Sequence, residues 1–239
     1  MKSSEMLQMS PMQFEHYRKL GLEALKRVTV RGERPQTVTY EISMKKEMEI
    51  ALAGNNPKTF NQADDNYKSS RNRQHLFNQT TGDGVPFSQG KTTPEFDATA
   101  DKIPAVSPVV LSLSRSNELK WNLDRFLPDE GTMRVRIRAG RTTMHPEAFA
   151  NLRLIFSAHT SNNANFSQVV SSRDIPVTAS AENPKFIHFD IPLSEIQRNP
   201  FRKLETTFPR RDEFLHIRNV SNASNRKEPL HVFIDHIEI

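Results

Sequence analysis

The chain has 239 residues, with 33 lysines and arginines against 28 acidic residues, for a net charge of +5. This length suits one domain with a buried core, and the hydrophobic fraction of 36% indicates a sizeable polar, loop-rich part. The absence of cysteine excludes disulfides, thiolate catalysis, cysteine-ligated metals and covalent haem attachment. Basic residues are spread along the chain and mixed with acids, so the concentrated patch of a nucleic-acid-binding protein is not indicated. There is no apolar run of about 18 residues and no signal peptide, so no membrane span is expected.

The N-terminal segment predicts a helix over residues 10–28. Ser10 suits the N-cap, Pro11 suits the first turn, and Gln13 completes a capping box. An apolar face follows at helical spacing and comprises Phe14, Tyr17, Gly21, Ala24, Leu25 and Val28. We therefore expect residues 1–31 to be a helical tail whose apolar face needs a partner.

Residues 36–43 alternate and are β-branched, which predicts a strand, whereas residues 44–52 fit either a short helix or a strand extension. The following stretch to Pro108 holds five prolines and four of the eight glycines, which is typical of loops and turns. We therefore expect residues 54–106 to be a loop-rich insertion, either a functional excursion over the surface or partly disordered.

Strand signals come close together after this insertion, separated by turn signals. The predicted strands are 108–114, 132–139, 151–160, 166–172, 185–191, 213–219 and 230–239, which with 36–43 makes eight. Residues 194–197 fit a single helical turn. Many short strands of this kind predict a mainly β fold, an antiparallel β-sandwich with jelly-roll-like organisation, over residues 32–239.

The strand at 132–139 shows the clearest alternation. Its inner face is predicted to carry Met133, Val135, Ile137 and Ala139. Its outer face is predicted to carry Arg134, Arg136 and Arg138, with Arg153 as a possible extension. This arginine ladder is either a grip for an anionic polysaccharide or acidic partner, or a solvated strand face.

Two further features are candidate ligand sites. An amide-rich turn contains Asn162, Asn163 and Asn165, which suit sugar hydroxyls or a calcium ion but are also ordinary turn formers. Trp121 is the only tryptophan, and it is either an exposed platform for a sugar ring or a core residue. Together with the three arginines, these four residues form the predicted ligand-binding set.

Metal and catalytic signals are weak. Carboxylates of the D-x-D-x-D calcium type are absent, so calcium is possible but unsupported. His231 and Asp235 are expected on one strand face and His236 on the other, while His188 with Asp190 offers only two ligands. No G-x-S-x-G elbow or phosphate loop occurs, so we expect no catalytic residue and no cofactor.

Three stretches carry a resemblance to a known family: residues 7–25, residues 123–169, and the C-terminal segments 191–201, 214–223 and 231–239. They resemble large planctomycete multidomain proteins of unknown function, in which a c-type cytochrome module precedes several helical domains. The resemblance implies a β-sandwich similar to carbohydrate-binding modules, preceded by the end of a helical domain. It also implies a periplasmic or cell-surface location for the full-length protein. The family's haem motif C-x-x-C-H is missing from this chain.

The C-terminal run ends inside a predicted strand, which suggests a fragment of a longer protein. We expect a non-catalytic module of an exported protein that binds a polysaccharide or a neighbouring domain. The first alternative is a structural spacer that positions the flanking helical and cytochrome domains. A second alternative is part of an enzyme whose active site lies elsewhere in the full-length protein.

Overall fold

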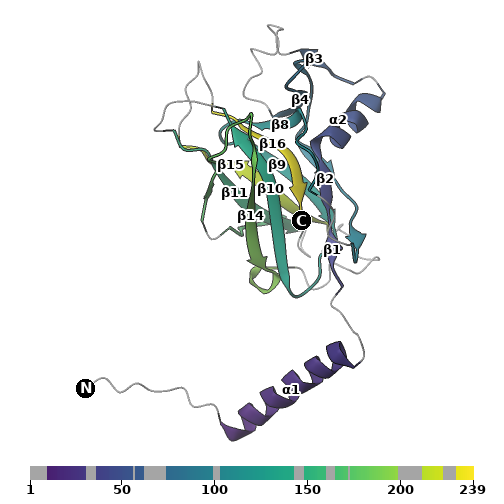
Figure 1. The fold of residues 1–239 in the computed structure, drawn as a ribbon, viewed down its shortest axis with the longest axis vertical. Helices are drawn as coiled ribbons and strands as arrows, with labels where there is room; N and C mark the ends of the chain where they lie inside the picture. Colours follow the sequence, from purple (N-terminus) through teal and green to yellow (C-terminus); the bar gives the residue numbers. More distant parts are fainter. Residues whose placement is uncertain are drawn as a thin grey trace, which may run out of the picture. The chain divides into compact units, whose positions relative to one another are not determined.

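The computed structural model describes residues 10–30, 36–55, 57–61, 74–98, 103–142, 148–159, 165–171, 173–198, 212–222 and 230–239. The chain separates into two compact units, residues 1–37 and residues 38–239. Figure 1 traces both units along the sequence.

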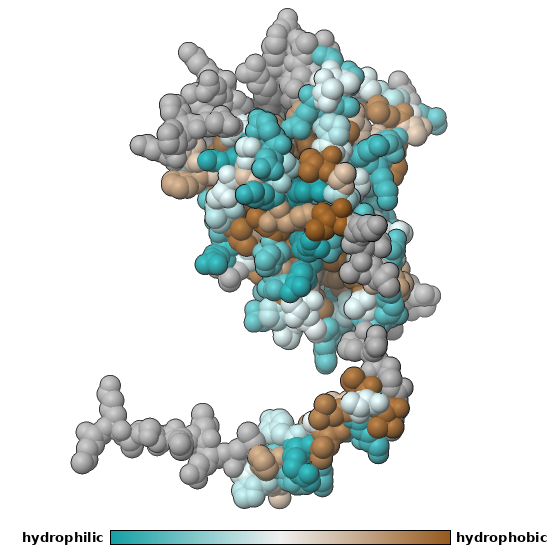
Figure 2. Space-filling view, viewed as in Figure 1, coloured by the Kyte–Doolittle hydropathy of each residue, from teal (hydrophilic) through white to brown (hydrophobic). Residues whose placement is uncertain are grey.

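The first unit contains helix α1 (Pro11–Thr29). The Ser10 hydroxyl accepts the Gln13 N–H, and the Gln13 side chain accepts the Ser10 N–H, so the predicted capping box is confirmed. The apolar side chains of α1 stay exposed, and Figure 2 shows them at its surface beside hydrophilic ones. No helix in the described residues has both the length and the apolar character to cross a membrane.

The second unit is built mainly from two β-sheets, with a third, two-stranded ribbon of β1 (Val38–Thr39) and β7 (Glu95–Phe96). The eight-stranded sheet has the order β14-β10-β16-β8-β4-β5-β3, with β2 also paired to β16. Its strands are β14 (Lys185–Pro192), β10 (Thr132–Arg141), β16 (Val232–Glu238), β8 (Val109–Leu113), β4 (His75–Asn78), β5 (Asp83–Pro86), β3 (Phe60–Asn61) and β2 (Glu41–Ser43).

The six-stranded sheet has the order β12-β11-β15-β9-β6, with β13 also paired to β11. Its strands are β12 (Asn165–Val169), β11 (Asn151–His159), β15 (Glu213–Asn219), β9 (Glu118–Asp124), β6 (Gln89–Lys91) and β13 (Ile175–Pro176). All pairs are antiparallel except β6 with β9. From β8 to β11 the chain crosses between the two sheets at every step, so the predicted jelly-roll-like sandwich is confirmed.

The core lies between the two sheets and follows from strand alternation. Met133, Val135 and Ile137 of β10 are buried, as predicted. Leu154 and Phe156 of β11, from the other sheet, are fully buried in the same core cluster. The predicted helical turn at 194–197 is the 3₁₀ turn η1 (Leu193–Glu195).

The ambiguous segment 44–52 is a helix, α2 (Met44–Ala53). It lies against β8, β16, β2 and β5 of the eight-stranded sheet (Figure 1). Met44 and Met48 are its buried residues, so the helix is held by one apolar stripe.

The prediction of a loop-rich insertion at 54–106 is wrong for residues 75–91, because this stretch contains strands of both sheets. Strands β4 and β5 extend the eight-stranded sheet, and β6 pairs with β9 of the other sheet. A Cβ at Gly84 would lie 2.4 Å from the Phe60 ring, and one at Gly90 would lie 1.9 Å from the Trp121 ring. These glycines therefore serve close packing within strands, although the sequence presents them as turn signals.

A bulge in β16 corrects one further expectation. Arg138 pairs with His236 and Ala139 with Ile234, so Asp235 is the extra residue. Ile234 and Ile237 are both in the core, so Asp235 and His236 both face the outer side. The expectation that His236 points away from Asp235 is therefore wrong, because simple alternation fails across a bulge.

Candidate functional site

The arginine ladder lies on the outer face of the eight-stranded sheet, and a carboxylate neutralises each rung. Arg134 bonds Asp190 at 2.7 Å, and Arg136 bonds Glu238 at 3.1 Å. Side-chain exposure falls along the ladder, from 65% at Arg134 to 30% at Arg136 and 5% at Arg138. The ladder is therefore a set of paired charges and not an open cationic stripe.

Arg138 is buried on this outer face, which corrects the prediction that it is solvated. Its guanidinium bonds Asp235 at 2.6 Å and also donates to the carbonyls of Pro104 and Ala105. The Ser107 N–H donates to the same Asp235 carboxylate. This network holds segment 103–107 against the sheet, so Arg138 has a structural role.

Trp121 is fully buried, so it is not an exposed platform for a sugar ring. Its ring packs on Gly90 and lies 5.8 Å from the Phe87 ring, between centroids. Asn162 and Asn163 lie outside the described residues, and Asn165 is described only as the first residue of β12. Among the described members of the predicted ligand-binding set, Trp121 lies in β9 of the six-stranded sheet and the three arginines lie in β10 of the eight-stranded sheet, so these are not brought together.

The outer face of the six-stranded sheet carries a continuous polar chain that the sequence analysis missed. Glu118 bonds Arg218 at 2.5 Å and lies 3.3 Å from His216 Nδ1, and His216 Nε2 bonds the Ser157 hydroxyl at 2.7 Å. Burial raises the pKa of Glu118, but the hydrogen bond and charge of Arg218 outweigh it and hold the pKa below its ordinary value. Burial lowers the pKa of His216 despite the nearby Glu118 carboxylate, so its imidazole is held neutral near pH 7.

The connectivity Ser157–His216–Glu118 is that of a hydrolase triad. Ser157, however, lies within β11, where it pairs with Ser167 on one side and Phe214 on the other. The main-chain N–H groups around it belong to the sheet ladder, so they do not form an oxyanion hole. The chain of hydrogen bonds fixes the side chains of this face and does not support acyl transfer.

A pocket of about 710 Å³, which we call the edge pocket, opens beside this polar chain. It lies where β6 and its preceding segment meet β9 and β15. Its lining residues are Gln74, Pro86, Phe87, Ser88, Gln89, Ser116, Asn117, Glu118, Lys120 and Arg218. It combines one half-buried aromatic ring with amide, hydroxyl and charged groups.

Main-chain hydrogen bonds fix the walls of the edge pocket. The Phe87 N–H donates to the Gln74 carbonyl, and the Lys120 N–H donates to the Ser88 carbonyl, both at 3.4 Å. Within the described part of the chain, the side-chain amides of Gln74 and Gln89 make no hydrogen bond. These two amides are therefore available to a ligand.

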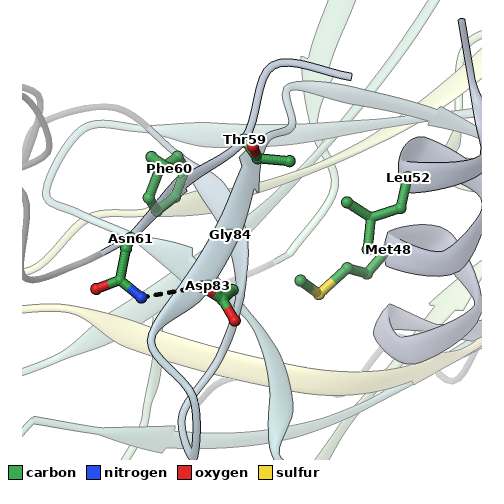
Figure 3. A pocket seen from close by; sticks show the side chains of 7 residues that line it. All are labelled: Met48, Leu52, Thr59, Phe60, Asn61, Asp83 and Gly84. Carbon is green, nitrogen blue, oxygen red and sulfur yellow. Dashed lines mark hydrogen bonds between the residues drawn. The ribbon is translucent and has the colours of Figure 1, made fainter. Parts of the chain in front are cut away.

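A second pocket, of about 460 Å³, lies between α2 and strands β3 and β5 (Figure 3). Met48 and Leu52 project into it from the helix, opposite Phe60 and Asn61. The Asn61 amide donates to the Asp83 carboxylate at 2.9 Å, and this bond lowers the pKa of Asp83. Its polar groups are thus engaged with each other, which leaves it the poorer candidate for a polar ligand.

Metal ligands do not gather in the part of the chain that the structure describes. No group of three or more histidines and carboxylates there has the arrangement of a metal site. Asp235 is held by Arg138, and Asp190 is held by Arg134. The His231 ring bonds the Ser112 hydroxyl at 2.8 Å.

Comparisons with known proteins find distant similarity to solved structures. No family model matches the chain, and no curated protein matches it. The chain is similar to the solved structure of the CBM22-1 xylan-binding domain from Paenibacillus barcinonensis Xyn10C, with 12% identity and a TM-score of 0.35 over 59% of this chain and 76% of that domain. It is also similar to the Cry4Aa mosquito-larvicidal toxin from Bacillus thuringiensis, with 11% identity and a TM-score of 0.28 over 54% of this chain and 18% of the toxin. Similarity at this level assigns no function to the chain.

Proposed function

We propose that residues 38–239 form a non-catalytic module that binds polysaccharide in the edge pocket. The observation that carries this proposal is the half-buried Phe87 ring beside two available amides and a fixed Glu118–Arg218 pair. A sugar ring has an apolar face that stacks on an aromatic ring and a rim of hydroxyls that bond amides and charged groups. The edge pocket supplies both kinds of contact on one rigid wall.

The expected affinity is modest. An open site gains little beyond the cost of ordering the sugar, so a dissociation constant of roughly 0.1 to 1 mM is expected, about −4 to −5.5 kcal/mol. The wider context that we propose is a larger exported protein with a neighbouring cytochrome and helical domains. The competing role is that of a structural spacer between such domains.

The test is a titration of the full chain with a panel of plant and algal polysaccharides by isothermal calorimetry, with and without calcium. For a glycan that binds, Phe87→Ala and Gln89→Ala should each weaken binding at least about 5-fold, because they remove the stacking ring and an available amide. Phe149→Ala is the matched control, since Phe149 is an exposed ring that does not line the pocket. It should leave binding unchanged.

The contrary outcomes are distinct. Absence of binding to every glycan at millimolar concentration supports the spacer role and refutes the module. Binding that survives Phe87→Ala and Gln89→Ala but is lost in Asn163→Ala would move the site to the amide-rich turn. Urea unfolding of each variant separates a lost contact from a lost fold.

A further inference from the structure

We propose that the edge pocket selects a sugar carrying an anionic substituent and that Lys120 is the residue that selects it. This inference rests on the proposed function and specifies its ligand class. The inference is based on an excess of positive charge among the residues that line the pocket on the outer face of the six-stranded sheet.

The charged groups of the edge pocket do not cancel. Glu118 and Arg218 form a pair at 2.5 Å, and the adjacent His216 is held neutral by its burial. Lys120 adds one positive charge, and among the described residues no carboxylate lies within ion-pair distance of its ammonium. The pocket therefore presents one net positive charge to an occupant.

The Lys120 side chain is held in position by a neighbouring ring. Its ammonium lies 4.1 Å from the centroid of Phe214, which is itself 7% exposed. Its main chain lies in β9, between His216 of β15 and Gln89 of β6. A cation fixed on a ring loses less freedom when it meets an anion, so it discriminates better than a solvated lysine.

The other described cations on the two sheets do not combine these features. Lys185 of β14 is exposed and lines neither pocket. Arg134, Arg136, Arg138 and Arg153 each bond a carboxylate, and Lys91 lies 3.3 Å from Asp124. An anion approaching any of them competes with a partner already in place. Lys120 is the cation that combines a pocket wall, a fixed side chain and the absence of an anionic partner in the described residues.

The ligand class follows from the two features together. Phe87 requires a ring face, and Lys120 requires a negative charge on the same ligand. A carboxylate of a uronic acid and a sulfate ester share this chemistry, and both are placed on a sugar ring. Inorganic sulfate or phosphate alone offers no ring to Phe87 and should not bind at millimolar concentration.

The experiment compares matched acidic and neutral ligands by calorimetry in EDTA. The pairs are oligogalacturonate with its full methyl ester, glucuronoxylan with unsubstituted xylan, and carrageenan with agarose. We expect at least one acidic member to bind about 10-fold more tightly than its neutral partner. Lys120→Met should reduce the acidic ligand to the affinity of the neutral one, and Lys185→Met, at an exposed lysine on the other sheet, should change neither.

Each result decides a separate point. Tighter binding of the uronates or of carrageenan identifies carboxylate or sulfate as the anionic group. Equal affinities within every pair, or an equal loss for both members in Lys120→Met, overturn this inference and leave the polysaccharide module standing. Absence of binding to all six ligands overturns this inference, and absence of binding to every glycan of the wider panel overturns the proposed function as well.

Discussion

The outer faces of the two sheets carry similar residues and use them differently. On the eight-stranded sheet, the three arginines of the ladder each form an ion pair with a carboxylate, so their charges are neutralised within the sheet. On the six-stranded sheet, Glu118 serves both Arg218 and His216, and Lys120 is left without an anion among the described residues. A row of like charges in a sequence is therefore a weaker sign of a binding site than one cation that the fold leaves uncompensated.

The two faces also differ in what covers them. Segment 103–107 lies over the inner end of the arginine ladder and removes Arg138 from water. On the other sheet, the segment before β6 forms the rim of a pocket and leaves Lys120 and Arg218 partly exposed. Both segments come from the region that the sequence analysis predicted to be an insertion. The segment before β6 leaves the edge pocket open, whereas segment 103–107 buries Arg138.

The largest effect should come from breaking the buried rung of the ladder. Arg138→Ala leaves Asp235 as an uncompensated buried carboxylate, and it should cost about 3–5 kcal/mol of unfolding free energy in urea. Arg138→Met combined with Asp235→Leu should recover most of this loss, because neither charge then remains. A cost no greater than that of Arg136→Ser would show that the buried pair is not structural.

A smaller loss should follow from crowding the base of the edge pocket. Gly90→Ala places a methyl group against the Trp121 ring, so β6 must shift, at a cost of about 1–3 kcal/mol. Binding of the best glycan should weaken as well, because Gln89 is adjacent to this position and Phe87 packs near the same Trp121 ring. Thr93→Ala, at an exposed position that does not line the pocket, should change neither stability nor binding, and comparable effects in the two variants would contradict the close packing.

Acidification should weaken both faces through one buried histidine on each. Burial lowers the pKa of His216 and of His236 from the ordinary value of 6.5. The unfolded chain then binds more protons than the folded chain, so stability is complete above about pH 6.5 and is lost as pH falls toward the depressed values. The lowered pKa values of Glu118 and Asp190 add a further loss below about pH 4.5.

The measurement for this effect is urea unfolding at several pH values between 7.5 and 5. His216→Gln should flatten the dependence relative to the unchanged chain, because it removes one of the two titrating groups. A free energy of unfolding that is constant over this range would contradict the burial of both imidazoles.

The smallest effect is expected at the exposed end of the ladder. Arg136→Ser removes a half-exposed pair with Glu238, so it should cost about 1 kcal/mol or less. Arg134→Ser should leave the urea midpoint and the glycan affinity unchanged. A loss of binding in either variant that also depends steeply on salt would return the anion site to the ladder.

Local patterns predicted much of the fold. The capping box of α1 and the alternation of β10 and β11 depend on neighbours a few residues apart, so the sequence displays them directly. Strand β9 was not predicted, although Leu119, Trp121 and Leu123 alternate with polar residues along it and are buried. The short strands β4 to β6 were not predicted because their pairing partners are distant in the sequence and because glycines, as in β5 and β6, are also typical of turns.

The candidate site was not predictable in the same way. Phe87 and Gln89 meet Glu118 and Lys120 through the parallel pairing of β6 with β9, and Arg218 comes from a strand about a hundred residues further on. The periodicity of a single strand does not predict which distant strands pair, so the sequence did not predict this pocket. Likewise, the residues that bury Arg138 lie more than thirty positions before it. Strand alternation therefore predicted that Arg138 lies on the outer face, but it did not predict that segment 103–107 buries it.

The burial of Trp121 gives the protein a built-in optical reporter. It is the single tryptophan of the chain, it is fully buried, and its indole N–H has no hydrogen-bond partner in the described structure. Tryptophan fluorescence therefore arises from one apolar environment, and Phe87 stands between that emitter and the edge pocket. A ligand that stacks on Phe87 lies one ring away from the indole, and detachment of β6 exposes the same indole to water. Changes in one emission band thus follow both occupancy of the pocket and integrity of its wall, without any added label.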